Sequence, residues 1–279
     1  MNSLRLTTPL ILQLKTAGAV THFSRPLHTP DGTPVPADVQ AVPEPDSAAV
    51  AFHLPDEVLV LRPALKVGRP VAIKERWRVG AWKAGHVAVD YGADGYARAE
   101  WLPVREPLLS ELIRGSIEDL QRTGYQPDEE GDYRWDFGRA PTRWRKPDTL
   151  RAHLARFAAQ PTHVRLVRLS DLTHEDALNA GMLHVSEGWM RQHFPTFLAR
   201  YTRVNSQNAE RVDAEGPGVQ LLDVPEPPAP LDRLRADLRR RHEIPPGQDV
   251  WLWAADLRRL DQTPAQLFEQ AARQTQDAS

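Results

Sequence analysis

Cysteine is absent from this 279-residue chain, and its absence excludes several kinds of chemistry. Without thiols the chain can form no disulfide, has no thiolate nucleophile and binds no zinc through cysteine. Long apolar runs are also missing, since none approaches the roughly 18–20 residues that a membrane-spanning helix needs. The first residues are too polar for the apolar centre of a signal peptide. We therefore expect a cytoplasmic protein without a membrane partner.

The sequence also lacks the common signatures of cofactor and metal sites. Residues 92–95, Gly-Ala-Asp-Gly, have neither the lysine of a phosphate-binding loop nor the glycine spacing of a dinucleotide-binding turn. No serine lies in a nucleophile elbow, and no two histidines have the i, i+4 spacing of a helical zinc site. The acidic residues form no pair at a catalytic spacing. We expect no cofactor and no metal site.

Charge is nearly balanced in total, at −2, but it is unevenly distributed. Residues 31–60 contain six acidic side chains and no lysine or arginine. Residues 139–168 contain eight basic side chains and a single acid, Asp148. This segregation predicts one negative and one positive face, although solvated surfaces can also show such runs by chance.

The most informative stretch is G-R-P-V-A-I-K-E-R-W at residues 68–77. A glycine turn opens it, and the apolar run that follows predicts a buried strand. Side chains alternate along a strand, so Lys74 and Arg76 share one face while Glu75 and Trp77 point inward. An inward carboxylate is costly unless a partner satisfies it, so Glu75 is the first candidate for function. For Trp77 we favour a place in the core.

Apolar periodicity predicts a mixed α+β chain without internal repeats. We expect the strand at 86–91 to be the antiparallel partner of the strand at 68–77. We also expect Gly115 to interrupt the helix predicted at 108–122. Helices are predicted at 9–15, 108–122, 147–160, 173–180, 186–201, 231–242 and 263–274. Strands are predicted at 4–6, 48–54, 57–61, 71–77, 86–91, 96–102, 162–169 and 250–254.

Four separate segments of this chain lie at residues 18–26, 68–77, 144–181 and 250–253. Together they resemble the ASCH family of PUA-like barrels, in the form found in many bacterial and phage-related proteins. They are similar, in order, to the family's glycine-led segment that ends in Arg-Pro, its G-D-x-L-W-V-R-E-T-W strand, its W-x-P to D-I-T-x-E-D-A stretch, and its terminal W-V-W-V strand.

The resemblance implies a mostly antiparallel PUA-like β-barrel flanked by helices, within the α+β class. It implies a single ASCH-like domain over residues 1–260, with insertions at about 105–143 and 203–245. Residues 261–279 would then form a C-terminal helical extension.

The resemblance carries over to the catalytic residues only in part. In family members that deacetylate acetylcytidine, a lysine and a threonine of the first segment act with the glutamate of the second. Glu75 matches that glutamate, but the lysine position falls on Val20 and the threonine position on Phe23. Valine and phenylalanine supply neither a nucleophile nor a proton shuttle. Glu75 is therefore a catalytic candidate only if the chain is an enzyme.

Three hypotheses for function follow. The first is a protein that binds RNA or single-stranded nucleic acid in a basic groove, where arginines hold phosphates and Trp144 offers a stacking plane, unless Trp144 is a core residue. The second is a hydrolase or nuclease that acts on RNA or a modified nucleoside. The third is a module that binds a protein partner. The nucleic-acid-binding candidates are Arg25, Lys74, Arg76, Arg143, Trp144, Arg145, Lys146 and Arg151.

Overall fold

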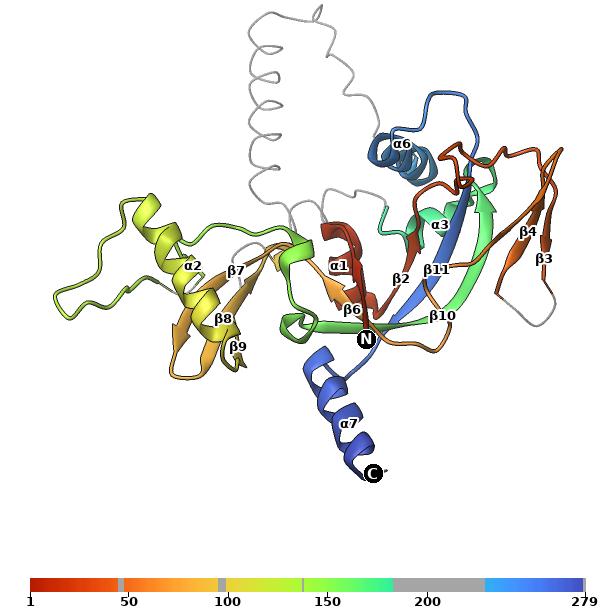
Figure 1. Cartoon of the computed structure of the whole chain (residues 1–279). Helices are drawn as coiled ribbons and strands as arrows, with labels where there is room; N and C mark the ends of the chain where they lie inside the picture. Colours follow the sequence, from red (N-terminus) through yellow and green to blue (C-terminus); the bar gives the residue numbers. More distant parts are fainter. Residues whose placement is uncertain (45–47, 95–98, 137, 183–228, 278–279) are drawn as a thin grey trace, which may run out of the picture. The chain divides into compact units, whose positions relative to one another are not determined.

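The computed structural model describes residues 1–44, 48–94, 99–136, 138–182 and 229–277 (Figure 1). Contacts divide the chain into two compact units, which are described separately. The larger unit comprises residues 1–171, 179–181 and 247–279. The described part of the smaller unit includes residues 172–178 and helix α6, Pro230–His242.

A five-stranded sheet with the strand order β1-β6-β10-β11-β2 is the centre of the larger unit. Strands β1 and β6 pair in parallel, and the other neighbours are antiparallel. Helix α1 (Thr8–Ala17) packs on β2 and β11. The strands are β1 (Asn2–Arg5), β2 (Ala19–Phe23), β6 (Val71–Lys74), β10 (Phe157–Arg168) and β11 (Trp251–Arg259).

Two antiparallel three-stranded sheets complete this unit. One is β3-β4-β5, whose strands are Ala41–Pro43, Val50–His53 and Val58–Leu61. The other is β7-β8-β9, beside which helix α2 (Leu108–Arg122) packs (Figure 1). Its strands are Trp77–Lys83, His86–Tyr91 and Ala99–Pro103.

Helix ends follow the local sequence. Glycine 18 ends α1 at φ 75°, a conformation that costs glycine little, and its N–H bonds the carbonyl of Leu14. Thr173 and Asp176 exchange backbone and side-chain hydrogen bonds at the start of α3 (His174–Asn179). Residues 263 and 266 cap α7 (Pro264–Asp277) in the same way. The helices predicted at 9–15, 173–180, 231–242 and 263–274 are thus confirmed.

The strand predicted at 71–77 is in fact two strands in two sheets. Strand β6 ends at Lys74 in the five-stranded sheet, and β7 begins at Trp77 in the other. Strand β8 therefore pairs with β7, through Trp77 and Tyr91, and not with β6 as predicted. The alternation of faces survives the change of sheet, because Glu75 and Trp77 are each 1% exposed while Arg76 is exposed.

The helix predicted at 147–160 is wrong. Two short 3-10 turns, Pro147–Thr149 and Ala152–Leu154, stand in its place, and β10 begins at Phe157. Leu150 and Leu154 are buried, as the apolar spacing required, but the backbone is not α-helical, and tertiary hydrogen bonds are made at Thr149 and Leu154. The Trp77 indole N–H donates to the Thr149 hydroxyl, and the Tyr91 hydroxyl donates to the Leu154 carbonyl.

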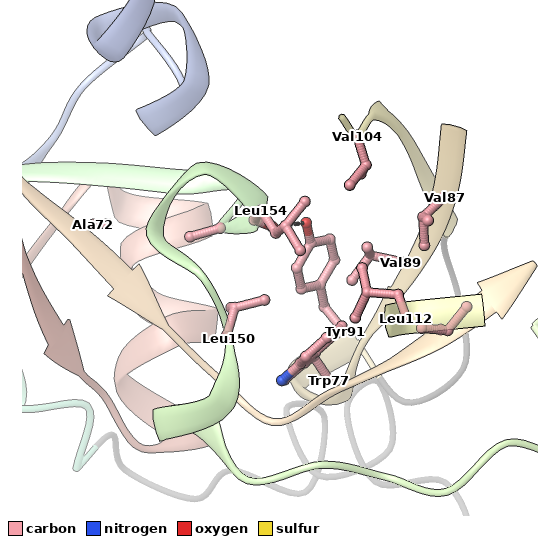
Figure 2. Packing of buried hydrophobic residues seen from close by; sticks show 11 residues of the cluster. Ala72, Trp77, Val87, Val89, Tyr91, Val104, Leu112, Leu150 and Leu154 are labelled. Carbon is pink, nitrogen blue, oxygen red and sulfur yellow. Dashed lines mark hydrogen bonds between the residues drawn. The ribbon is translucent and has the colours of Figure 1, made fainter. Parts of the chain in front are cut away.

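Both leucines belong to a core that joins the five-stranded sheet to the sheet β7-β8-β9. Figure 2 shows Trp77 and Tyr91 facing Leu150, Leu154 and Leu112 of α2, with the Tyr91 hydroxyl bonded to Leu154. Trp77 is thus a core residue, as expected. Helix α2 has the predicted bounds and continues through Gly115, so the predicted interruption is wrong.

The fold is therefore mixed α+β, with five helices and three mostly antiparallel sheets in the described part of the chain. Among these residues no sheet closes into a barrel. The helix predicted at 186–201 lies outside the described residues.

Candidate nucleic-acid interface

Most of the predicted binding residues lie on or against one segment, residues 143–151. Its start pairs with β7, because the backbone groups of Arg145 and Trp77 exchange hydrogen bonds of 2.7 and 3.3 Å. Further along, the Lys74 ammonium donates to the carbonyl of Asp148 at 3.1 Å. The fold thus brings Lys74 and Arg76, at the junction of two sheets, beside residues that are about 70 positions later in the sequence.

The residues before this segment cover the outer edge of β7. Arg78 reaches across that edge and donates to the carbonyls of Gly138 and Ala140, while its Nε bonds Asp90 at 3.0 Å. The Thr142 hydroxyl donates to the carbonyl of Val79. These contacts fix residues 138–145 along β7 and so place Trp144 next to the arginines of this strand.

Trp144 is half-buried, so it is neither a fully buried core residue nor a fully exposed stacking plane. The guanidinium groups of Arg76 and Arg78 lie 5.3 and 4.6 Å from the centre of its ring. Arg78 is buried and paired with Asp90, whereas Arg76 is exposed. The indole therefore supports Arg76 at the surface by a cation–π contact.

A second group of arginines surrounds one buried carboxylate on α2. Asp119 has a side chain 2% exposed, and the arginines within ion-pair distance of it are Arg122, Arg143 and Arg145, at 3.1, 3.1 and 3.7 Å. Three positive charges thus meet one negative charge. Arg122 and Arg143 reach solvent, while Arg145 is mostly buried against the Trp77 ring.

Burial lowers the pKa of the Arg145 guanidinium, and the Asp119 charge opposes that shift. An arginine retains its proton under such conditions, so the group keeps its positive surplus.

Three further cations on this surface are exposed. Within the residues that the structure describes, Arg76, Lys146 and Arg151 form no ion pair. Their charges are therefore available to an incoming anion. Lys74 and Arg76 lie at the sheet junction, and Arg143, Lys146 and Arg151 lie on segment 143–151 beside it. We call these five residues, with Trp144 and Arg145, the arginine–tryptophan surface.

Glu75 faces inward at the same junction, as expected, but its carboxylate already has partners. Arg156 binds both carboxylate oxygens, at 2.8 and 3.0 Å, and the backbone N–H of Ala93 approaches one of them at 3.3 Å. The side chains of Glu75 and Arg156 are 1% and 8% exposed. Arg156 also lies over the Tyr91 and Phe157 rings. This placement favours a structural role for Glu75.

Arg25, the remaining predicted residue, lies elsewhere. It follows β2 and lines a pocket together with His22, Ser24 and Trp253. No hydrogen bond or ion pair joins it to segment 143–151 within the described residues. Val20 and Phe23, at the family's lysine and threonine positions, are 3% and 4% exposed and belong to the core.

Sequence reasoning missed Asp119 and Arg78. Asp119 had a usable signal: it follows Leu112 and Ser116 at helical spacing, so it is a carboxylate on the buried stripe of an amphipathic helix. The burial of Arg78 had no such signal, because its partners Gly138, Ala140 and Asp90 come from two other parts of the chain.

Comparison of the chain with protein-family models, with curated proteins and with solved structures gave no match in any of the three. Among the residues with described positions, no cluster of three histidine or acidic side chains could hold a metal ion. The helices in that part of the chain are all too short or too polar to cross a membrane.

Proposed function

We propose that this chain binds single-stranded nucleic acid, RNA in the first place, at the arginine–tryptophan surface. The observation that carries the proposal is the supported Arg76: an exposed guanidinium without an ion pair among the described residues, held over a half-buried indole. A guanidinium plane can bond a phosphate and stack on an unpaired base. The surface would therefore offer both contacts that single-stranded binding uses.

The neighbouring charges support a strand and not a single small anion. Exposed Lys146 and Arg151 lie on segment 143–151, which pairs with β7 next to Arg76, and the Asp119 group adds two positive charges beyond the one that its carboxylate balances. Several separate cations can contact successive phosphates.

Membership of the ASCH family, with its PUA-like barrel, is part of this proposal. Its support is topological. The four segments that carry the resemblance contain β2, β6, β10 and the first three residues of β11, and these strands are contiguous in the five-stranded sheet in the order β6-β10-β11-β2. Segments that are far apart in the sequence and resemble one family would thus form one continuous structure.

The proposal is tested with a fluorescein-labelled single-stranded oligouridine and an oligothymidine of the same length. Fluorescence anisotropy titrations are made at several salt concentrations. With about three phosphates contacted, the slope of log affinity against log salt is expected to be about −2. Arg76→Gln should weaken binding by about ten-fold and reduce the slope by about 0.7.

Two further variants make the test specific. Arg76→Lys keeps the charge and removes the planar group, so we expect it to keep the slope while losing affinity. Arg69→Gln removes an exposed arginine outside this surface and should bind as the wild type does. Absence of binding at low salt, or equal losses in the Arg76 and Arg69 variants, would contradict the proposal.

A further inference from the structure

A second place where the chain could bind an anion lies on the face of the five-stranded sheet. It is a pocket of about 770 Å³, within the range of small-molecule sites. The register of the sheet explains its floor. His22, Ala255 and Val164 are direct neighbours across β2, β11 and β10. Trp253 lies two residues before Ala255 and therefore on the same face of β11.

Further lining comes from β1, through Asn2, Ser3 and Leu4, and from the end of β5 in the sheet β3-β4-β5. Trp253 packs with Val50 and Phe52 of β4 in a second apolar core. The chain leaves β5 at Leu61, and residues 61–65 then run along the pocket. The apolar part of the lining includes Leu4, Leu27, Leu61, Val164 and Trp253, of which Trp253 is only 8% exposed.

The ionisable side chains that line the pocket are all basic. Among the described residues that line the pocket, the ionisable side chains are His22, Arg25, His28 and Arg62, and none is a carboxylate. Arg25 and Arg62 are exposed and form no ion pair within the described chain. Two arginines facing a pocket without an acid would attract and bind an anion.

One part of the rim is held in a fixed conformation. The Ser24 hydroxyl accepts from the Trp253 backbone N–H at 2.9 Å and donates to the Arg25 carbonyl at 2.6 Å. The Nδ1 of His28 lies 2.8 Å from the Pro26 carbonyl, which fixes the ring so that Nε2 is its remaining hydrogen-bonding atom. The loop that carries Arg25 is thus tied to β11 through Ser24, and a second bond to β11 runs from the Leu27 N–H to the Trp251 carbonyl at 2.9 Å.

We infer that this pocket binds an organic phosphate that carries an aromatic ring, a nucleoside monophosphate being the simplest example. The phosphate would lie between Arg25 and Arg62, and the ring would enter the apolar interior near Trp253. An inorganic anion alone would leave most of the pocket unfilled, and an uncharged nucleoside would leave the arginines unused. This inference goes beyond strand binding at the arginine–tryptophan surface and does not depend on it.

Isothermal titration calorimetry with three probes tests the inference: AMP, adenosine and inorganic phosphate. AMP is expected to bind at least about ten-fold more tightly than either fragment, because only AMP uses both the rim and the interior. Arg25→Gln and Arg62→Gln should each weaken AMP binding by about ten-fold. Arg69→Gln, an exposed arginine of a neighbouring pocket, is the matched control and should bind AMP normally.

A substitution in the floor gives an independent check. Val164→Phe places a ring in the half-buried interior and should abolish AMP binding without a change in far-ultraviolet circular dichroism. A fourth probe, 5′-phosphorylated tetra-adenylate, separates a free nucleotide from the end of a strand. Binding of either AMP or the tetranucleotide that is lost in the Arg25 and Arg62 variants supports the inference, and the tighter of the two identifies the source.

The inference is overturned if neither AMP nor the phosphorylated tetra-adenylate binds, or if the Arg25→Gln, Arg62→Gln and Arg69→Gln variants bind with equal affinity. It is also overturned if adenosine binds as tightly as AMP. The two proposals fail separately, because strand binding is measured on Arg76 variants with an unphosphorylated oligonucleotide, and nucleotide binding on variants of this pocket.

Discussion

Replacing Glu75 by glutamine removes one charge from a buried ion pair and nearly keeps the size of the side chain. The carboxylate is 1% exposed, and Arg156, 8% exposed, binds both of its oxygens. The guanidinium also packs over the Tyr91 and Phe157 rings, so it has no short path to solvent. The substitution therefore removes the carboxylate charge that faces this buried cation.

Breaking a buried ion pair by removing one partner costs about 3–5 kcal/mol. We expect the lower end, about 3 kcal/mol, because the amide oxygen of glutamine can still accept one hydrogen bond from Arg156. Domains of ordinary stability unfold with about 5–15 kcal/mol, so the loss is a large fraction of the total. Urea unfolding followed by circular dichroism should show a lower midpoint with an unchanged slope.

The matched control is Asp148→Asn, which breaks the ion pair of Asp148 with Arg5. Those side chains are 69% and 66% exposed, and the closest atoms are 3.5 Å apart. An exposed pair contributes at most about 1 kcal/mol, so the control should unfold close to the wild type. A double variant, Glu75→Gln with Arg156→Met, should recover part of the loss because the uncompensated charge is removed.

The structural account of Glu75 is refuted if Glu75→Gln unfolds like the control. An increase in stability would point the other way, toward a strained functional carboxylate, since active-site residues are often costly to the fold. Turnover of acetylated nucleosides or RNA by the wild type, absent in the glutamine variant, would then favour the hydrolase hypothesis.

Three smaller predictions concern single positions. Gly115→Ala should stabilise α2 by about 0.5–1 kcal/mol, since a Cβ there meets only Arg145 Nη2 at 3.4 Å. Gly80→Ala should destabilise by about 1–3 kcal/mol, because its Cβ would lie 2.6 Å from the Asp90 carboxylate; both are measured by urea unfolding. Burial raises the pKa of Asp90 above 3.8 while Arg78 opposes the shift. A carboxyl group whose pKa is higher in the folded state stabilises the fold at acidic pH. That stabilisation is lost as the pH rises through the raised pKa. The stability of the wild type relative to Asp90→Asn should therefore increase as the pH falls from 7 toward 4; an unchanged difference would contradict this.

How much the sequence predicted depended on the range of the interactions. The caps at Thr173 and Thr263, the bounds of α2 and the inward direction of Glu75 and Trp77 follow from neighbours within a few positions, and all were predictable. The break of the strand after Lys74 was not, because it depends on which sheet each half joins.

Segment 147–160 shows that local apolar spacing does not decide the backbone conformation where distant residues bond to it. Its leucines have helical spacing and are buried, yet hydrogen bonds to Trp77 and Tyr91 select a different backbone. The candidate interface, too, was only partly predictable from the sequence. Runs of arginine around Trp144 were visible in the sequence, but Asp119 at the centre of one cluster is brought to them only by α2, more than 20 positions earlier. The pocket beside Arg25 required knowledge of which strands are neighbours.

The cover that residues 138–145 provide over β7 has a consequence for solution behaviour. An uncovered outer strand presents unpaired amides and carbonyls that can recruit the same strand of a second molecule. Here the Thr142 hydroxyl bonds the carbonyl of Val79 and the backbone of Arg145 bonds that of Trp77, so irregular contacts occupy backbone groups of β7, while Arg78 holds the covering residues in place. A shortened chain without these eight residues would be expected to aggregate through β7 even if its core still formed.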